Sequence, residues 1–342
     1  GFLIERSQKV WSFSHLTFQE YLVAINITEN KKKFIYLATK IPEFKWCEVF
    51  LLTALILQDA SEFLILTKQT IDQVIAGEEK LQFFLKWLFY KTQSIRSCYK
   101  PSAIRAFYFS LELFEDFSPA IEFACNLDVN FEDEFSSVIE SGFRAEYNDG
   151  NGSIICYDNF EASLIHASNS DIEIDCELTR VIIRGIYLCA GESINYAVRA
   201  SVLMVALNRL ISLSDKLPIQ QPLKDLIKQL PQPLSIISIS PEPIFPKTYT
   251  IEFMDFWKNN GEVWIDKLRN IMIEHRNIGH IWEFTDDIEE LWWHYYDANK
   301  LLIDCLNNGC KVTSEVRKEI ENNLLLPIAE IEKRKQEQAS VQ

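Results

Sequence analysis

Apolar residues recur at three- and four-residue spacing along most of this chain of 342 residues. The segment 80–92 gives a clear example. Leu81, Phe84 and Leu88 lie on one stripe of it, and charged residues occupy much of the rest. The chain holds only 10 glycines, so it has few of the turns that a many-stranded sheet needs. The pattern therefore predicts an all-α fold. Comparable helical segments are expected at 34–41, 46–57, 62–75, 103–115, 119–127, 172–190 and 194–213.

Two of the predicted helices share a short sequence. The residues AIRA at 103–106 return as AVRA at 197–200. Helical-repeat proteins place such small and apolar residues where neighbouring helices pack closely, so the recurrence fits a HEAT-like helical array over 31–213. The same four residues are also expected where good helix formers are simply used often. Both interpretations stay open.

Prolines divide the helical pattern into two parts. Seven of the 11 lie between Pro218 and Pro246, a density that prevents long helices. We therefore predict a linker over 214–249, with one short helix at 223–230 inside it. Helical spacing returns after the linker and predicts a C-terminal helical domain over 250–335.

The beginning of the chain has the alternating pattern of strands. Trp11 and Phe13 fall on one face, and the polar stretch 6–9 suits a turn, so residues 2–13 predict a β-hairpin. An isolated hairpin is only marginally stable in water and needs a neighbour to pack against. Since the first residue is Gly rather than Met, we expect the chain to start inside a longer protein.

The pattern then changes abruptly from strand to helix. Thr17 has the side chain of a good N-cap, and Glu20 three residues later completes a predicted capping box. Leu16 and Tyr21 have the spacing of a hydrophobic staple around that cap. We therefore expect Thr17 to be the N-cap of the first helix.

His15, one of only five histidines, comes just before this predicted cap. The free N–H groups and partial positive charge of a helix N-terminus favour an anion nearby, such as a nucleotide phosphate. The alternative is that the imidazole simply bonds the backbone of the hairpin. The residues alone leave both roles open for His15, which is the candidate cofactor-binding residue of the chain.

Composition excludes several classes of partner. The formal net charge of −15 opposes binding to nucleic acid, which needs a surplus of Lys and Arg. Eight cysteines occur without a CxxC pair, which favours buried thiols in a reducing cytoplasm over disulfides or a zinc site. The most apolar window, 49–57, is too short to span a bilayer, and we find no secretory signal. We expect a cytoplasmic location, without nucleic-acid or membrane partners.

No common catalytic motif occurs in the sequence. Walker A, GxGxxG, GxSxG and HExxH patterns are all missing, so we expect no catalytic residue and no enzyme activity in this part of the protein. His275 and His280 are five residues apart, which does not place two ligands on one helix face, so we expect no metal site. An enzyme centred on these two histidines and nearby acids is an alternative hypothesis.

Aromatic and acidic residues gather in a few further places. The run 282–296 holds five Trp and Tyr residues, which suit either nucleobase stacking or packing. Packing is favoured because no Lys or Arg residue accompanies them. The acidic clusters at 132–134 and 286–290 fit solvated helix starts better than paired catalytic carboxylates.

The stretch WSFSHLTFQEYLVA at 11–24 resembles the F-x-H-x-[ST]-F-Q-E-[YF] signature of NACHT-family proteins, part of the STAND class of signal-transduction ATPases. In that family the signature closes the winged-helix domain that follows the nucleotide-binding domain. Its histidine approaches the β-phosphate of ADP and helps to hold the resting, closed state. The resemblance gives this role to His15. The other matched positions, which are structural, are Phe13, Phe18, Gln19, Glu20 and Tyr21.

Longer stretches at 268–284 and 295–328 are similar to the C-terminal helical domain of cyanobacterial NACHT proteins. The segment KPSAIRAFYFSL at 100–111 is similar to their middle helical region. The resemblance implies the end of a winged-helix domain at 1–30, before the array, the linker and the C-terminal domain. The nucleotide-binding domain is not within these residues. ADP or ATP is therefore expected in the parent protein, and no cofactor in this part alone.

The resemblance implies a regulatory and sensing role for this helical region. The parent would switch from a closed ADP form to an open, oligomeric ATP form when the helical part senses a ligand, in bacterial defence signalling such as antiphage immunity. Its partners would be its own upstream nucleotide-binding domain, and a protein ligand or further copies of itself. The competing hypothesis is a helical scaffold that binds a protein partner without nucleotide coupling.

Overall fold

The computed structural model describes residues 3–7, 9–13, 15–41, 43–112, 118–131, 170–189, 196–231 and 247–341. The predicted all-α class with an N-terminal β-hairpin is confirmed. The hairpin pairs β1 (Leu3–Ser7) with β2 (Val10–Phe13) in antiparallel register. The helices are α1 (Leu16–Thr28), α2 (Lys32–Ala38), the short 3-10 helix η1 (Phe44–Trp46), α3 (Cys47–Ile56), α4 (Ser61–Val74), α5 (Glu79–Ser94), α6 (Pro101–Leu111), α7 (Ser118–Cys125), α10 (Ser170–Cys189), α11 (Tyr196–Leu213), α12 (Gln220–Ile227), α13 (Lys247–Arg276), α14 (Asp286–Asn307), α15 (Ser314–Asn323) and α16 (Ile328–Val341).

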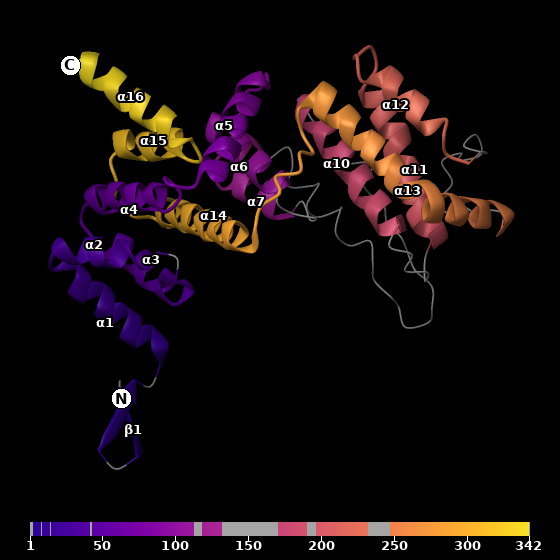
Figure 1. Cartoon of the computed structure of the whole chain (residues 1–342). Coiled ribbons are helices and arrows are strands. Elements are labelled where there is room, and N and C mark those ends of the chain that lie inside the picture. The colour runs from indigo at the N-terminus through magenta and orange to yellow at the C-terminus, as the bar shows by residue number, and fades with distance from the viewer. Residues whose placement is uncertain are drawn as a thin grey trace.

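The helices form two groups in space (Figure 1). In the first group, α14 packs along α3 and α4, and α15 packs against α4 and α6. In the second group, α10 packs against α11 and α13, and α12 lies on α13. The chain leaves the first group after α7, builds the second, and returns with α14. Helices within 250–335 therefore belong to both groups. The domain boundaries at 30, 213 and 249 stay predictions.

Helix α6 lies at the centre of the first group. Every residue of 102–111 is buried, since α5, α7 and α15 all pack around this helix. The ring of Phe109 stacks on Tyr296 of α14 with centroids 6.0 Å apart, and meets Trp292 edge-on at 5.5 Å. Burial of Trp292, Tyr295 and Tyr296 confirms the packing role predicted for the aromatic run 282–296 at these residues, whereas Trp293 is exposed.

A buried arginine fastens α15 to α6. The Nε of Arg105 donates to the carbonyl of Leu324 at 2.6 Å, and its Nη2 donates to that of Asn322 at 2.9 Å. These acceptors lie at the end of α15, where helical carbonyls have no partner within the helix. Burial lowers the pKa of Arg105 to about 9. The bonds satisfy both the enclosed guanidinium and the end of the helix.

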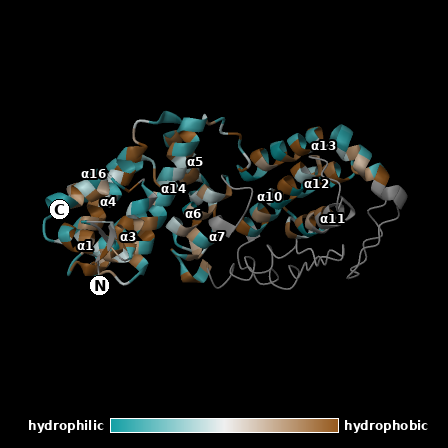
Figure 2. Ribbon diagram, turned by 90° about the horizontal axis from the view of Figure 1, so that it is seen from below, coloured by the Kyte–Doolittle hydropathy of each residue, from teal (hydrophilic) through white to brown (hydrophobic). Residues whose placement is uncertain are grey.

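Helices α10 and α13 approach each other closely at glycines. A Cβ at Gly261 would overlap the Sγ of Cys189 and lie 2.7 Å from Cε3 of Trp257, so a side chain there requires these neighbours to shift. A Cβ at Gly185 would lie 3.1 Å from Cγ1 of Ile265. Figure 2 shows hydrophobic and hydrophilic residues alternating along α13, as expected of a helix with one buried face.

The start of α1 differs from the prediction. The helix begins at Leu16 and its N-cap is His15, whose backbone is extended with φ −136° and ψ 143°. The carbonyl of His15 accepts the N–H of Phe18 at 3.3 Å, so the first turn closes with Thr17 already inside it. The prediction that Thr17 is the N-cap of a capping box with Glu20 is therefore wrong.

The predicted hydrophobic staple is also wrong. Leu16 is the first residue of the helix rather than a residue outside it, and 66% of its side chain is exposed. Tyr21, its predicted partner, is 47% exposed. Leu22 is likewise exposed, so α1 carries three exposed apolar side chains at separate positions around its axis.

The linker, acidic-cluster and repeat predictions concern segments that the structure describes only in part. The short helix predicted at 223–230 is present as α12, three residues earlier. Residues 232–246 of the predicted linker and the acidic cluster 132–134 lie outside the described residues, and α13 begins at Lys247, before the predicted end of the linker at 249. The AIRA and AVRA segments both lie in helices, and the repeat hypothesis stays open. Within the described ranges, none of the helices combines the length and apolar character that crossing a membrane requires.

We predict that Gly261→Ala lowers the free energy of unfolding by about 2 kcal/mol, because the added methyl group forces α10 and α13 apart. The measurement is urea denaturation followed by circular dichroism. Gly77→Ala is the matched control, since a Cβ there meets nothing within 4 Å, and it should change stability by less than about 0.5 kcal/mol. Equal unfolding free energies of the two variants would contradict the close approach of α10 and α13 at Gly261.

Candidate functional site at the joint between the helix groups

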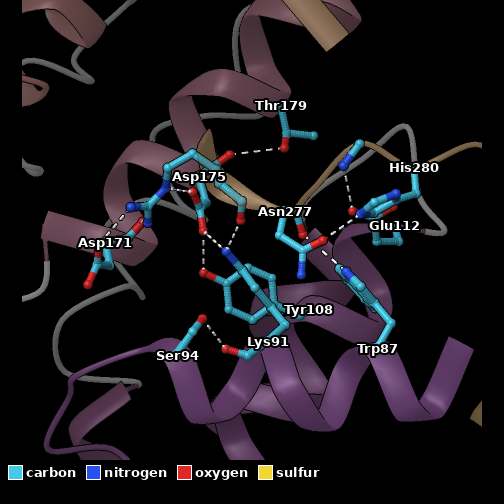
Figure 3. Close-up of polar contacts among 12 residues, drawn as sticks. Trp87, Lys91, Ser94, Tyr108, Glu112, Asp171, Asp175, Thr179, Asn277 and His280 are labelled. Carbon is cyan, nitrogen blue, oxygen red and sulfur yellow. Dashed lines mark hydrogen bonds and ion pairs between the residues drawn. The ribbon is translucent and has the colours of Figure 1, made fainter. Parts of the chain in front are cut away.

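Four side chains from four helices meet in a buried cluster between the two helix groups. We call this cluster the joint, and it consists of Lys91 of α5, Tyr108 of α6, Asp175 of α10 and Arg276 of α13. Figure 3 shows Lys91 and Tyr108 pointing toward Asp175. The Oδ2 of Asp175 accepts from Lys91 Nζ at 2.8 Å and from the Tyr108 hydroxyl at 2.6 Å. Its Oδ1 accepts from Arg276 Nε at 2.6 Å.

The two cations of the joint, Lys91 and Arg276, are balanced by Asp175 together with Asp171 of α10. Asp175 has no exposed surface and Lys91 is also buried. Arg276 spans Asp175 and Asp171, because its Nη1 donates to Asp171 Oδ1 at 2.8 Å. Removing one partner of a buried ion pair leaves an uncompensated charge and costs about 3–5 kcal/mol. The joint therefore consists of charged contacts between helices of the two groups, and losing either partner would leave a charge without its counterion.

The pKa shifts in the joint indicate which of its side chains are charged and which donate hydrogen bonds. Burial lowers the pKa of Lys91, and pairing with Asp175 opposes that change. Burial and the adjacent Asp175 carboxylate raise the pKa of Tyr108 well above its usual value. Burial also lowers the pKa of Arg276, but the carboxylates of Asp175 and Asp171 outweigh it and raise the value overall. Tyr108 is thus a donor, and Arg276 a cation, at neutral pH.

A second set of contacts holds the connection between α13 and α14, residues 277–285, against the first group. The Glu112 carboxylate accepts the N–H of Gly279 at 2.8 Å and the indole N–H of Trp282 at 3.1 Å. The indole of Trp87 donates to the carbonyl of Asn277 at 3.1 Å. Asn277 and Gly279 have φ values of 54° and 79°, so the chain turns away from α13 where these bonds begin.

Glu112 is an ionisable group in an unusual setting. Its side chain retains some accessible surface, yet burial among protein atoms raises the pKa of its carboxyl to about 7. The N–H groups of Gly279 and Trp282 favour the carboxylate and lower the pKa by less. The contact that holds the connection therefore changes charge near neutral pH.

The structure places His15 away from the joint, at the N-terminal end of the first group (Figure 1). Its side chain is exposed, and its ring contacts that of Phe18 edge-on at 5.9 Å. The imidazole makes no hydrogen bond to the described part of the chain, so a bond to the described hairpin backbone is not observed. The role of His15 toward ADP stays a prediction.

His275 and His280 lie on different elements. Helix α13 ends at Arg276, so only His275 is helical. The Nε2 of His280 lies 2.8 Å from Oδ1 of Asn277, its ring lies 5.8 Å from that of Trp87, and burial lowers its pKa. Across the described ranges, no group of three His, Cys, Asp or Glu residues is placed to hold a metal ion.

Sequence reasoning missed the residues of the joint. Lys91 lies three residues after Leu88 and so continues the apolar stripe of α5. A charged residue on an apolar stripe was the one sequence signal that could have indicated a buried ion pair. Asp171 and Asp175 share one face of α10 by their four-residue spacing. Their partner Arg276 lies 101 residues beyond Asp175, and no pattern in the sequence connects them.

Residues 219–327 match the family model of the NACHT C-terminal helical domain 2. The match covers α12 to α15, and so includes Arg276 and the connection that Glu112 holds. It supports the predicted NACHT helical part of the chain. Comparisons with curated proteins and with solved structures found no significant match.

We predict that Asp175→Asn lowers the free energy of unfolding by about 3 kcal/mol, because Lys91 and Arg276 lose the carboxylate that neutralises them. Chemical denaturation measures the change. Asp225→Asn is the matched control, since Asp225 pairs with Lys228 on the exposed surface, and its effect should stay below about 0.5 kcal/mol. Similar losses of unfolding free energy in both variants would show that the buried ion pairs contribute no more to stability than the exposed one.

The pKa of Glu112 gives a pH prediction of defined sign. Its value in the folded chain is about 7, above the usual 4.5, so the folded state holds a proton that the unfolded state has released. The contribution of Glu112 to stability therefore falls as the pH rises from 4.5 to about 7. Denaturation of the native chain and of Glu112→Gln across this window measures it. A constant difference between the two curves would contradict the assignment.

Proposed function

We propose that this chain is the regulatory and sensing helical part of a NACHT-family signal-transduction ATPase. The observation that carries the proposal is the match of residues 219–327 to the NACHT C-terminal helical domain 2. The signature resemblance at 11–24 supports it from the opposite end of the chain. The parent protein binds ADP and ATP in a separate nucleotide-binding domain, whereas this part holds no nucleotide by itself and catalyses no reaction.

His15 is the proposed contact of this part with the nucleotide. Its imidazole is exposed at the N-cap of α1, where the first N–H groups of a helix have no carbonyl four residues earlier to accept them. A phosphate presented by the nucleotide-binding domain would meet both the imidazole and the positive end of the helix dipole. This arrangement fits the family role of the histidine in holding the closed ADP state.

A path of packed helices leads from His15 to the joint. Helix α1 packs on α3, and α3 packs on α14. Helix α14 follows the connection that Glu112 and Trp87 hold, and the connection follows Arg276 directly. We propose that the closed ADP form and the open, oligomeric ATP form differ in how these elements are packed. A ligand that binds one form better then shifts the balance between them.

Helix α1 is the proposed contact with the nucleotide-binding domain of the parent. Leu16, Tyr21 and Leu22 are exposed on it, and a neighbouring domain that packs around α1 would bury these apolar side chains. The activating partner is a protein ligand or further copies of the parent, in the bacterial cytoplasm. The signal serves antiphage defence.

A second candidate function is a helical scaffold that binds a protein partner without nucleotide coupling. It is favoured by exposed apolar residues beside α1, namely Ile35 and Tyr36 of α2 and Leu55 of α3. In that case residues 31–335 carry the binding, and the hairpin and His15 are dispensable.

The test is His15→Ala in the full-length parent, with ADP retention and activation as readouts. Loss of a hydrogen bond to a charged phosphate should weaken ADP binding by about tenfold and ease activation. His294→Ala is the matched control, because His294 is a partly exposed histidine on α14. Unchanged ADP affinity together with unchanged activation would refute the role of His15 and favour the scaffold.

A further inference from the structure

A pocket of about 280 Å³ opens beside the joint. Its walls come from three helices: Tyr90 and Ser94 of α5, Asp171 of α10, and His275 and Arg276 of α13. We propose that this pocket binds a small molecule that carries one oxyanion group, a phosphate or a carboxylate, beside a planar ring.

The guanidinium of Arg276 supplies the anion-binding group. Three of its N–H bonds are used by Asp175 Oδ1, by Asp171 Oδ1 and by the Asp171 carbonyl. A guanidinium has five such donors, so these three bonds leave one hydrogen on Nη1 and one on Nη2. The side chain is 14% exposed. Paired guanidinium N–H bonds match the oxygens of a phosphate or a carboxylate.

The other polar residues of the pocket restrict the charge of the ligand. Asp171 lies against Arg276, and Glu274 is exposed at the edge of the pocket. These carboxylates repel a ligand with several anionic groups. His275 and Asn277 line the same pocket and offer N–H donors. A single oxyanion group is therefore the best fit.

Tyr90 supplies a flat surface for the ring of the ligand. Its side chain is 55% exposed, although the adjacent Lys91 is buried in the joint. The neighbouring ring of Phe89 lies 5.5 Å away and supports it from the same helix. An exposed aromatic ring beside a polar pocket suits the stacking of a planar group. The ring on Tyr90 and the oxyanion on Arg276 place the ligand across α5 and α13.

Such a ligand would contact both helix groups at once and stabilise the joint between them. This inference deepens the proposed function, because it names the chemistry of a ligand that the helical part would sense. Binding is measured on this chain by itself. Its failure is therefore distinguishable from a failure of nucleotide coupling through His15, which is measured on the parent protein.

The test is isothermal titration of the chain with phenyl phosphate, benzoate and inorganic phosphate. Saturable binding of phenyl phosphate or of benzoate supports the site, and the tighter of the two identifies the oxyanion. Inorganic phosphate lacks the ring and should bind about tenfold more weakly than phenyl phosphate. Equal affinities of these two probes would overturn stacking on Tyr90. No saturable binding of either aromatic probe up to about 10 mM would overturn the site.

Substitutions in the pocket test whether the aromatic probe binds there. Arg276→Lys keeps the charge but removes the paired donors, and should weaken the tighter aromatic probe by about tenfold. Ser94→Leu fills the pocket from the exposed end of α5 and should abolish binding. Arg269→Lys is the control, two turns earlier on α13. Circular dichroism establishes that each variant is folded. Unchanged affinity in folded Ser94→Leu would place the bound probe elsewhere and overturn the proposal.

Discussion

The buried carboxylate of Asp175 is the contact on which the arrangement of the two helix groups depends. It accepts bonds from Lys91, Tyr108 and Arg276, and these donors come from three other helices. Charged hydrogen bonds are strong and directional in a poorly hydrated interior, and they are costly when incomplete. Apolar packing fills the space within each group, whereas this carboxylate fixes how the second group sits on the first.

The joint and the connection after Arg276 act on the same stretch of chain. The last turn of α13 is held by Asp175 and Asp171, and the residues that follow are held by Glu112 and Trp87. Helix α14 then passes into the core of the first group, where it contacts α3 and α4. A change at the joint therefore has a short physical route to α14, and through α3 to α1. This continuity is what the proposed switch requires of its helical part.

Much of the fold was predictable because helical periodicity is a local property. The stripe through Leu81, Phe84 and Leu88 indicated α5, and these residues are buried as expected. The start of α1 was not predictable in detail. Thr17 has the better capping side chain, but the backbone of His15 is extended and the helix begins at the next residue, Leu16.

The joint was beyond sequence reasoning for a different reason. Lys91 and Asp175 are 84 residues apart in the sequence, and Asp175 and Arg276 are 101 residues apart. Their pairing depends on the return of the chain from the second helix group to the first, and no periodicity encodes that route. His15 could be selected from its motif, whereas the pocket beside Arg276 emerged only from the packing of three helices.

The central claim is that the buried carboxylate couples the two helix groups. Hydrogen exchange followed by mass spectrometry, on the native chain and on Asp175→Asn, tests it most directly. The expected result is faster exchange in the C-terminal half of α5 and in the last turns of α13 together, with α3 and α4 unchanged. Faster exchange confined to α10, or no change in α5 and α13, would contradict the coupling.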